Sequence, residues 1–178
     1  MDEREERLAG YVSAVILRCT ARAAGLLGGP RADLVRPAES DDDWYANVLW
    51  IERRKCLLLM HAGTLFPVFV ADVRTAAWRP PGRAVVAAIE SALAREQLAA
   101  GALGALDSDE IVIAATASRR VLGYLNETGH ACRNAVELAS GLEHVDVDAL
   151  NHGLCRLLHN RDGYITPMDL IARRGDRG

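Results

Sequence analysis

The sequence lacks any apolar run close to the roughly 20 residues that a helix needs to cross a bilayer. Its first ten residues, MDEREERLAG, are charged and lack the apolar core of a secretory signal peptide. The formal net charge of -3 gives no overall attraction to nucleic acid or to an anionic membrane. These absences predict a cytoplasmic protein that does not associate with membranes.

Paired cysteines and known catalytic signatures are missing as well. The four cysteines stand far apart, and no two of them form a C-x-x-C motif, so neither a zinc knuckle nor a redox pair is indicated. The chain contains no Gly-rich phosphate loop, no Gly-x-Ser-x-Gly elbow and no His-Glu-x-x-His motif. We therefore predict no cofactor, and no recognised catalytic motif argues for an enzyme.

No convincing set of metal ligands is present. Asp41-Asp42-Asp43 does not have the alternating spacing of a calcium-binding loop. His152 and His159 are seven residues apart and could share a helix face, but no carboxylate or cysteine completes a ligand set. The sequence thus predicts no metal site.

The chain contains enough hydrophobic residues to form the core of one globular domain. Of its 178 residues, 50% are hydrophobic and 25% are charged, which suits a single core. We expect an α+β domain over residues 13–172, preceded by a charged extension, residues 1–12, and followed by a loose tail, residues 173–178.

The stretch from Asp41 to Arg74 holds most of the aromatic residues and the longest apolar runs. Trp44–Glu52 and Lys55–Ala62 are rich in aromatic and branched side chains, which is typical of strands. Folding them back at Arg53-Arg54 would pair Glu52 with Lys55 and Trp50 with Leu57. Because the turn lacks Asn-Gly or Asp-Gly, we expect a loop wider than two residues.

The remaining pattern predicts a mainly antiparallel sheet built on this hairpin, with three longer helices packed on it. Further strands are expected at Val15–Arg18, Leu65–Ala71 and Ile111–Ala115, and Pro67 favours an edge position for the second of these. The longer helices are predicted at Ala84–Ala100, from a Ser118 cap to Leu138, and from an Asp146 cap over Val147–His159, where Leu158 is among the residues expected to face inward. Shorter helical turns are expected with Thr20 and Thr166 as caps. We expect the helices to cover the sheet face that carries Trp44, Trp50, Leu57 and Leu59.

Three segments of the sequence are similar to a known family of domains. They are Arg18-Cys19-Thr20, the long stretch DDWYANVLWIERRKCLLLMHAGTLFPVFVADVR, and TASRRVLGYLNE at 116–127. Together they resemble an uncharacterised bacterial domain family, a domain of unknown function associated with proteins of plasmid and transposon passenger type, over roughly Val15 to Ile171. Relatives tend to show Ser-Arg-Ser-Val-Leu-Gly followed by Met-Asn, whereas this chain has Arg120 and Leu125. The resemblance implies no established activity.

One face of the helix after Ser118 is a candidate anion-binding surface. Arg119, Asn126, His130 and Arg133 recur at three- and four-residue steps, so they share a face and could hold a phosphate or carboxylate. The alternative is an ordinary solvated helix face, balanced by nearby glutamates. His61 could act as a general base, or it could be a hydrogen-bonded structural histidine at a strand end.

The hairpin tip is a candidate contact for nucleic acid. Arg53, Arg54 and Lys55 are three adjacent cations that could touch a phosphate backbone. Because the chain as a whole is acidic, solvated turn residues are the simpler interpretation.

Two functional hypotheses follow. The first is a cytosolic binding or regulatory module that acts through a protein partner or self-association and is linked to mobile genetic elements. The second is a small hydrolase or nuclease-like enzyme acting on an anionic, phosphate-bearing substrate. The second requires His61 to meet Arg119 and Asn126 in one pocket.

Overall fold

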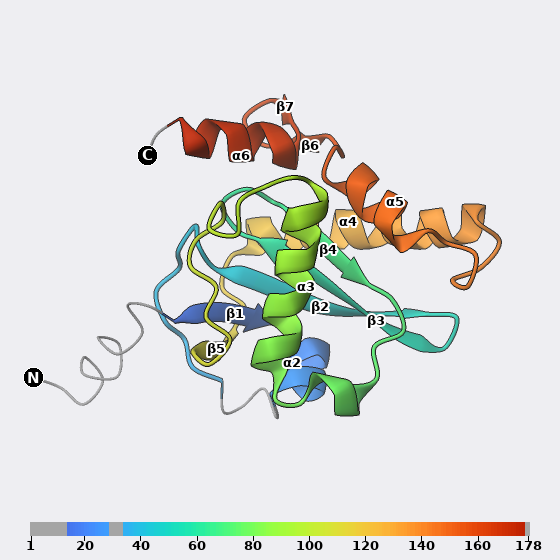
Figure 1. Cartoon of the computed structure of the whole chain (residues 1–178), viewed down its shortest axis with the longest axis horizontal. Helices are drawn as coiled ribbons and strands as arrows, with labels where there is room; N and C mark the ends of the chain where they lie inside the picture. Colours follow the sequence, from blue (N-terminus) through green and yellow to red (C-terminus); the bar gives the residue numbers. More distant parts are fainter. Residues whose placement is uncertain (1–13, 29–33, 177–178) are drawn as a thin grey trace, which may run out of the picture.

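The computed structural model of the chain describes residues 14–28 and 34–176, so the expected extension at residues 1–12 lies outside the described residues. Its centre is a five-stranded sheet in the order β4-β3-β2-β1-β5 (Figure 1). In chain order, the strands are β1 (Val15–Cys19), β2 (Trp44–Ile51), β3 (Arg54–His61), β4 (Pro67–Val70) and β5 (Ile111–Ala115). The helices are α2 (Ala21–Leu27), α3 (Pro81–Arg95), α4 (Arg119–Leu138), α5 (Val147–Leu154) and α6 (Pro167–Gly175), with a 3-10 turn, η2 (Thr75–Trp78), before α3.

The α+β class is confirmed, but the sheet is mixed and the expectation of a mainly antiparallel sheet needs correction. β2 pairs antiparallel with β3, and β3 with β4, whereas β1 pairs in parallel with both β2 and β5. The connections give the physical reason. α2 follows β1 directly, and a helical crossover brings the chain back so that the next strand runs in the same direction.

The central hairpin forms where it was predicted, but its turn is tighter than expected. Ile51 pairs with Arg54, so Glu52 and Arg53 make a two-residue turn with positive φ values of 49° and 66°. The Glu52 carboxylate accepts a hydrogen bond from the Leu142 backbone N–H at 3.0 Å. This contact helps to hold a backbone conformation that residues other than glycine rarely adopt. The register differs from the predicted one by two residues, so each side chain keeps its predicted face.

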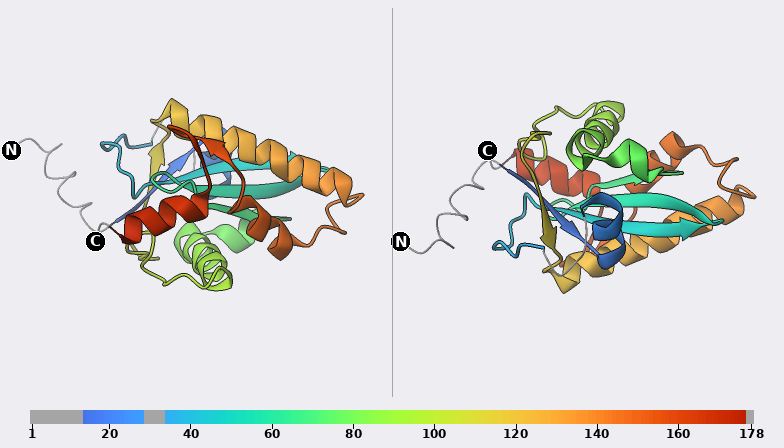
Figure 2. Two further views of the ribbon diagram at one scale, coloured as in Figure 1. Left: turned by 90° about the horizontal axis from the view of Figure 1, so that it is seen from above. Right: turned by 90° about the horizontal axis from the view of Figure 1, so that it is seen from below.

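Helices cover both faces of the sheet, as Figure 2 shows for α3 and α4. Trp44 and Leu57 lie in the core beneath α2 and α3, on the face that we expected to be covered. The helices do not cover Trp50 near the hairpin turn, which is 50% exposed. Leu58 and Met60 point the other way and pack beneath α4. This second cover explains why Cys56–Met60 of β3 is a continuous apolar run instead of an alternating one.

Local capping signals account for the starts of the helices. Side-chain oxygens accept hydrogen bonds from the first turns of four helices, at the predicted residues Thr20, Ser118, Asp146 and Thr166. α3 carries no such cap and instead begins with Pro81 at its first position. It starts earlier than the predicted Ala84 and ends at Arg95, before the predicted Ala100.

The C-terminal part differs most from expectation. α5 stops at Leu154, because His159 and Asn160 form the short strand β6, which pairs with β7 (Tyr164–Ile165). Leu158, which we expected to face inward, is 63% exposed. Only α3 and α4 are therefore long helices, and α6 extends into the segment that we expected to be a loose tail. None of the helices in the ranges 14–28 and 34–176 combines the length and apolar character needed to span a bilayer.

Candidate functional site

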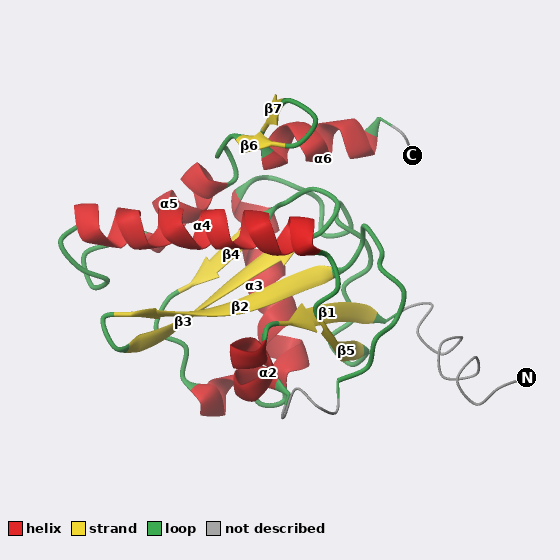
Figure 3. Cartoon of the chain, turned by 180° about the vertical axis from the view of Figure 1, so that it is seen from behind, coloured by secondary structure: helices red, strands yellow, loops and turns green. Residues whose placement is uncertain are grey.

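A polar groove opens where α4 begins. It has a volume of about 400 Å³ and is walled by the first turn of α4, residues 39–41, Tyr45 of β2, and Arg161 between β6 and β7. Figure 3 shows α4 lying across the sheet, with the β6–β7 hairpin close to it. The walls come from segments that are far apart in the sequence, so no local motif marks this groove.

Two hydroxyl groups are fixed at the bottom of the groove. Tyr45 is buried, and its hydroxyl oxygen accepts a hydrogen bond from the Ser118 backbone N–H at 3.0 Å. Burial raises the pKa of Tyr45, so the phenol keeps its proton at neutral pH and can still donate. The Ser118 hydroxyl oxygen accepts from the Val121 backbone N–H at 3.3 Å, which leaves its own proton free for a ligand.

Two arginines border the same space. Arg120 donates to the Asp162 carboxylate at 3.1 Å and to the Tyr124 hydroxyl at 3.4 Å. These two hydrogen bonds raise the pKa of Arg120. Arg161 donates through Nη1 to the Gly63 carbonyl at 2.7 Å. Each guanidinium has five N–H donors, so both keep donors for a further partner.

The electrostatics of the α4 start are unusual. The first turn contains no acidic residue, although negative side chains normally favour this position because the helix dipole is positive there. Instead, Arg119 and Arg120 occupy the first two positions of the helix. Their backbone N–H groups have no intrahelical acceptor. The start of α4 is therefore a locally positive region.

Part of the groove wall is acidic, and a second cavity adjoins the groove. Glu39 and Asp41 form this acidic wall. Asp41 and Arg161 also line the second cavity, of about 340 Å³, together with Arg173 of α6. Positive and negative side chains thus line both cavities.

A buried arginine holds the acidic wall in place. The Arg18 side chain is buried and donates to the Asp43 carboxylate at 2.5 Å. It also donates to three carbonyl oxygens, at 3.0 Å for Pro37, 2.7 Å for Ala38 and 3.2 Å for Ala115. Arg18 therefore ties the chain segment before β2 to the ends of β1 and β5.

His61 does not join this groove. It is fully buried, and its Nδ1 accepts from the Thr64 backbone N–H at 3.2 Å and lies 2.9 Å from the Thr64 hydroxyl. An acceptor Nδ1 places the ring proton on Nε2. Burial lowers the pKa of His61 to about 4. His61 follows the alternation of Leu57 and so points to the α3 side of the sheet, whereas α4 covers the other side. His61 therefore does not share a pocket with Arg119 and Asn126, which the hydrolase or nuclease-like hypothesis requires.

The predicted anion-binding face of α4 is open to solvent. Its four side chains, Arg119, Asn126, His130 and Arg133, are exposed. None of them makes an ion pair or a side-chain hydrogen bond with another residue in the described ranges. This arrangement matches the solvated helix face that was the alternative interpretation. Arg120, which was noted only as a departure from the family pattern, is the arginine that reaches the groove.

The basic hairpin tip is largely engaged within the molecule. Arg54 lies 3.6 Å from the Glu143 carboxylate. Lys55 pairs with Trp50, not with Glu52 as predicted, and its Nζ lies 5.7 Å from the centre of the Trp50 ring. Arg53 is exposed and makes no such contact among the described residues. This engagement weakens the case for nucleic-acid binding at the tip.

Two further features bear on chemistry. His159 is buried against Tyr124, with ring centres 5.3 Å apart, and its Nδ1 lies 3.6 Å from the Glu127 carboxylate. The four cysteines are free and buried. Within the described part of the chain, no three His, Cys, Asp or Glu side chains gather closely enough to hold a metal ion.

Sequence reasoning missed Tyr45 and Arg161 as groove residues. One signal was available, since the helix predicted after Ser118 begins with two arginines and no acid. That pattern conflicts with the preference of a helix start for negative charge. The contribution of Arg161 depends on the β6–β7 turn and could not be read from local pattern.

Comparisons with known proteins place the chain in a family. No curated protein and no solved structure matches it. A family model described as a domain of unknown function, DUF6933, matches residues 16–170. This range includes the whole sheet except its first residue and all of the groove. The chain therefore belongs to the DUF6933 family of domains of unknown function.

Proposed function

We propose that this protein is a binding module that holds an anionic group, a phosphate or a carboxylate, in the groove at the start of α4. The observation that carries the proposal is a convergence of donors. The hydroxyls of Tyr45 and Ser118 and the guanidinium groups of Arg120 and Arg161 all border one cavity. Such groups bind anionic oxygens through charge-assisted hydrogen bonds.

A bound anion also relieves an unfavourable arrangement of charge. Arg119 and Arg120 place two positive charges at the positive end of α4, and each such placement costs about 0.3–1 kcal/mol. Asp162 compensates Arg120 alone, and its side chain is 87% exposed, so this pair contributes little. An anion at the helix start interacts favourably with both arginines and with the free N–H groups of the first turn.

The acidic wall narrows the class of ligand. Glu39 and Asp41 line the same cavity as the arginines and repel a highly charged polyanion. A ligand that carries one anionic group next to a hydrogen-bond donor, such as a hydroxyl or an amide, satisfies both walls. Phosphomonoesters of polyhydroxyl compounds and carboxylates within peptides have this character.

The position of the histidines favours binding over the hydrolase or nuclease-like alternative. His61 lies beneath the other face of the sheet, and His159 is buried outside the groove. No histidine is among the residues that line the cavity in the described part of the chain. The cavity therefore offers no imidazole as a general base, and the carboxylates of Glu39 and Asp41 are the remaining candidates among its lining residues.

We further propose that the module acts through contact with a partner that carries the anion. Proteins of plasmids and transposons are the first partners to test, because the family resemblance points to that association. In this role, the groove recognises the partner and the module regulates it.

The experiment is a titration with inorganic phosphate and with a phosphomonoester, followed by the backbone amide resonances of Ser118 and Arg120. We expect a dissociation constant on the order of millimolar for phosphate alone, equivalent to about 4 kcal/mol. Replacing Arg161 or Arg120 with Met should weaken binding at least about fivefold, since each removes a charge-assisted contact.

Arg119→Met provides the matched control, because Arg119 neighbours Arg120 but does not line the cavity. It should weaken binding by less than about twofold through its charge alone. If the Arg119 and Arg161 variants weaken binding equally, or if phosphate leaves the amides unmoved, the groove is not an anion site.

A further inference from the structure

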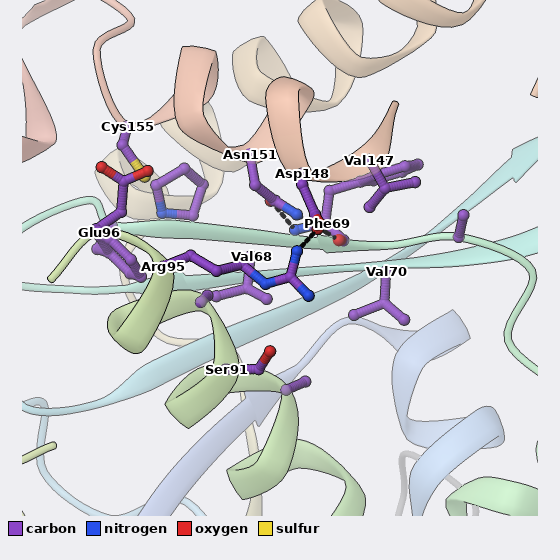
Figure 4. A pocket seen from close by; sticks show the side chains of 15 residues that line it. Val68, Phe69, Val70, Ser91, Arg95, Glu96, Val147, Asp148, Asn151 and Cys155 are labelled. Atoms are coloured by element: carbon purple, nitrogen blue, oxygen red, sulfur yellow. Dashed lines mark hydrogen bonds and ion pairs between the residues drawn. The ribbon is translucent and has the colours of Figure 1, made fainter. Parts of the chain in front are cut away.

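The β6–β7 hairpin, which carries Arg161, depends on its neighbours for its position. Its strands have two residues each, and such a small two-stranded ribbon is marginally stable at best by itself. The helices on either side of it are fixed. Asn151 of α5 makes two hydrogen bonds to the Phe69 backbone, at 2.7 and 2.9 Å (Figure 4), and α6 begins with a capping box and buries Ile171. The ends of the hairpin are thus held, and the contacts of its middle decide where Arg161 lies.

Two hydrogen bonds fasten the hairpin to α4, one on each side of Arg161. The Tyr124 hydroxyl donates to the Asn160 carbonyl at 2.8 Å, and Arg120 donates to the Asp162 carboxylate at 3.1 Å. Arg120 is the other arginine of the groove. Because Asn160 and Asp162 are the chain neighbours of Arg161, these bonds set the spacing between the two guanidinium groups.

His159 packs directly against this connection. Its side chain is 1% exposed, and its ring lies edge-on to the Tyr124 ring with the centres 5.3 Å apart. Neither ring nitrogen has a hydrogen-bond partner among residues 14–28 and 34–176. A buried polar group without a partner is costly. A phenylalanine ring would fill the same space without that cost, so the ability of this side chain to take up a proton is the feature to explain.

The surroundings of His159 favour its neutral form. Two titratable groups of α4 face the ring, the Tyr124 phenol and the Glu127 carboxylate. A Glu127 oxygen lies 3.6 Å from Nδ1, which is too far for an N–H···O hydrogen bond. The charged side chains of the hairpin itself, Arg161 and Asp162, bond to other partners. Burial therefore lowers the pKa of His159, and Glu127 offsets this only in part.

We propose that His159 is a positioning residue for the anion site. Its neutral ring holds the β6–β7 hairpin on α4 and Arg161 at the groove, and its protonation releases the hairpin and weakens anion binding. This inference rests on the function proposed above. His159 is not among the residues that line the cavity, so it acts through the position of Arg161.

The direction of the pH effect follows from linkage. Docking of the hairpin lowers the pKa of His159 below the ordinary value of about 6.5, so docking and protonation oppose each other. The contribution of the docked hairpin to anion affinity is therefore complete above about pH 6.5 and decreases as the pH falls below that value.

The first test measures sulfate binding, because sulfate keeps its charge over the range from about pH 7.5 to about pH 5. The wild type is compared with His159→Phe, which keeps an aromatic ring against Tyr124 and takes up no proton. On acidification, we expect the affinity of the wild type to fall about threefold or more relative to that of His159→Phe, toward the affinity of Arg161→Met. Protonation of Glu39 and Asp41, which line the cavity, is common to both proteins and cancels in this ratio.

A matched exchange on the exposed face of α4 gives the control. His130→Phe replaces an exposed histidine and should keep the pH profile of the wild type. If the wild type and His159→Phe lose affinity equally on acidification, or if His130→Phe changes the profile as much as His159→Phe does, the proposal is overturned.

Hydrogen exchange without sulfate separates this inference from the proposed function. The Arg161 amide donates to the Gly163 carbonyl at 2.9 Å within the hairpin, and this bond should open when the hairpin leaves α4. Relative to His159→Phe, protection of this amide in the wild type should fall about threefold or more between about pH 7.5 and about pH 5. This contrast without sulfate binding at either pH would refute the anion site and leave the control of the hairpin by His159 intact. Equal protection in the two proteins would refute that control, whatever the result with sulfate.

Discussion

The segment of residues 34–43 has two sides, and they differ in how fully their polar groups are bonded. On the inner side, the Arg18 guanidinium binds Asp43 and three carbonyl oxygens and is shielded from water. On the outer side, Glu39 and Asp41 line the same cavity as Arg120 and Arg161. Arginine and acidic side chains thus stabilise the fold on the inner side, where their hydrogen bonds are complete. On the outer side the same residue types keep hydrogen-bonding groups available for a ligand.

The difference also shows how the fold supports the groove. Arg18 positions the segment whose outer side forms the acidic wall, so the two sides are coupled through the backbone. We expect substitutions on the inner side to act mainly on stability and those on the outer side mainly on binding. Three measurements test this division, beginning with the largest expected effect.

Arg18→Met should lower the free energy of unfolding by about 3–5 kcal/mol, because it leaves the Asp43 carboxylate buried without its partner. Urea denaturation measures the change. Arg22→Met, at an exposed position of α2, is the matched control and should change stability by less than about 0.5 kcal/mol. A loss below about 1 kcal/mol for Arg18→Met would mean that the inner side does not carry the stability we assign to it.

The buried His61 makes the free energy of unfolding depend on pH. Its pKa is about 4 in the folded protein and about 6.5 in the unfolded chain, so the unfolded chain binds more protons between these values. The stability that neutral His61 contributes should be complete above about pH 6.5 and fall by about 3 kcal/mol as the pH drops to 4. Burial of His159 lowers its pKa too and adds to the loss.

The contribution of His61 can be separated by substitution. In His61→Asn, where an amide oxygen can accept the Thr64 N–H, the slope of unfolding free energy against pH should become clearly shallower between pH 6.5 and 4. Arg22→Met gives the control, since an arginine does not titrate between pH 4 and 6.5 and its removal should leave the slope unchanged. An unchanged slope in the His61 variant would contradict the assignment.

The smallest change in the free energy of unfolding is expected for a residue that lines the groove. Ser118→Ala removes the cap of α4 and should cost about 1 kcal/mol of stability, while also weakening phosphate binding through loss of the hydroxyl donor. Ser91→Ala, at an exposed position within α3, should be neutral or slightly stabilising. If Ser118→Ala costs as much stability as Arg18→Met, the two sides of the segment do not differ as proposed.

Much of the fold was predictable because it depends on local pattern. The caps at Thr20, Ser118, Asp146 and Thr166 and the edge position of Pro67 follow from single residues and their neighbours. The face of each residue in the hairpin was also predictable, although the register was wrong by two positions, because side chains alternate with a period of two. The turn itself was missed, since its positive φ values depend on the distant contact between Glu52 and Leu142.

The pairing of β1 and the groove were not predictable for a common reason. Nothing in the composition of Val15–Cys19 distinguishes a parallel neighbour from an antiparallel one. Likewise, Tyr45, Arg120 and Arg161 belong to separate segments that meet only after the sheet and the β6–β7 hairpin have formed. The sequence predicted an anion-binding surface on the correct helix but chose its exposed face instead of its first turn.

The parallel placement of β1 has a consequence for how the chain is made. Val15–Cys19 lies between β2 and β5, and it pairs with Ile111–Ala115, almost one hundred positions later. A nascent chain that has not yet emerged from the ribosome as far as residue 115 therefore exposes one side of its first strand. Pairings so distant in sequence form slowly, so during synthesis this side of the strand stays unpaired until residues 111–115 have emerged.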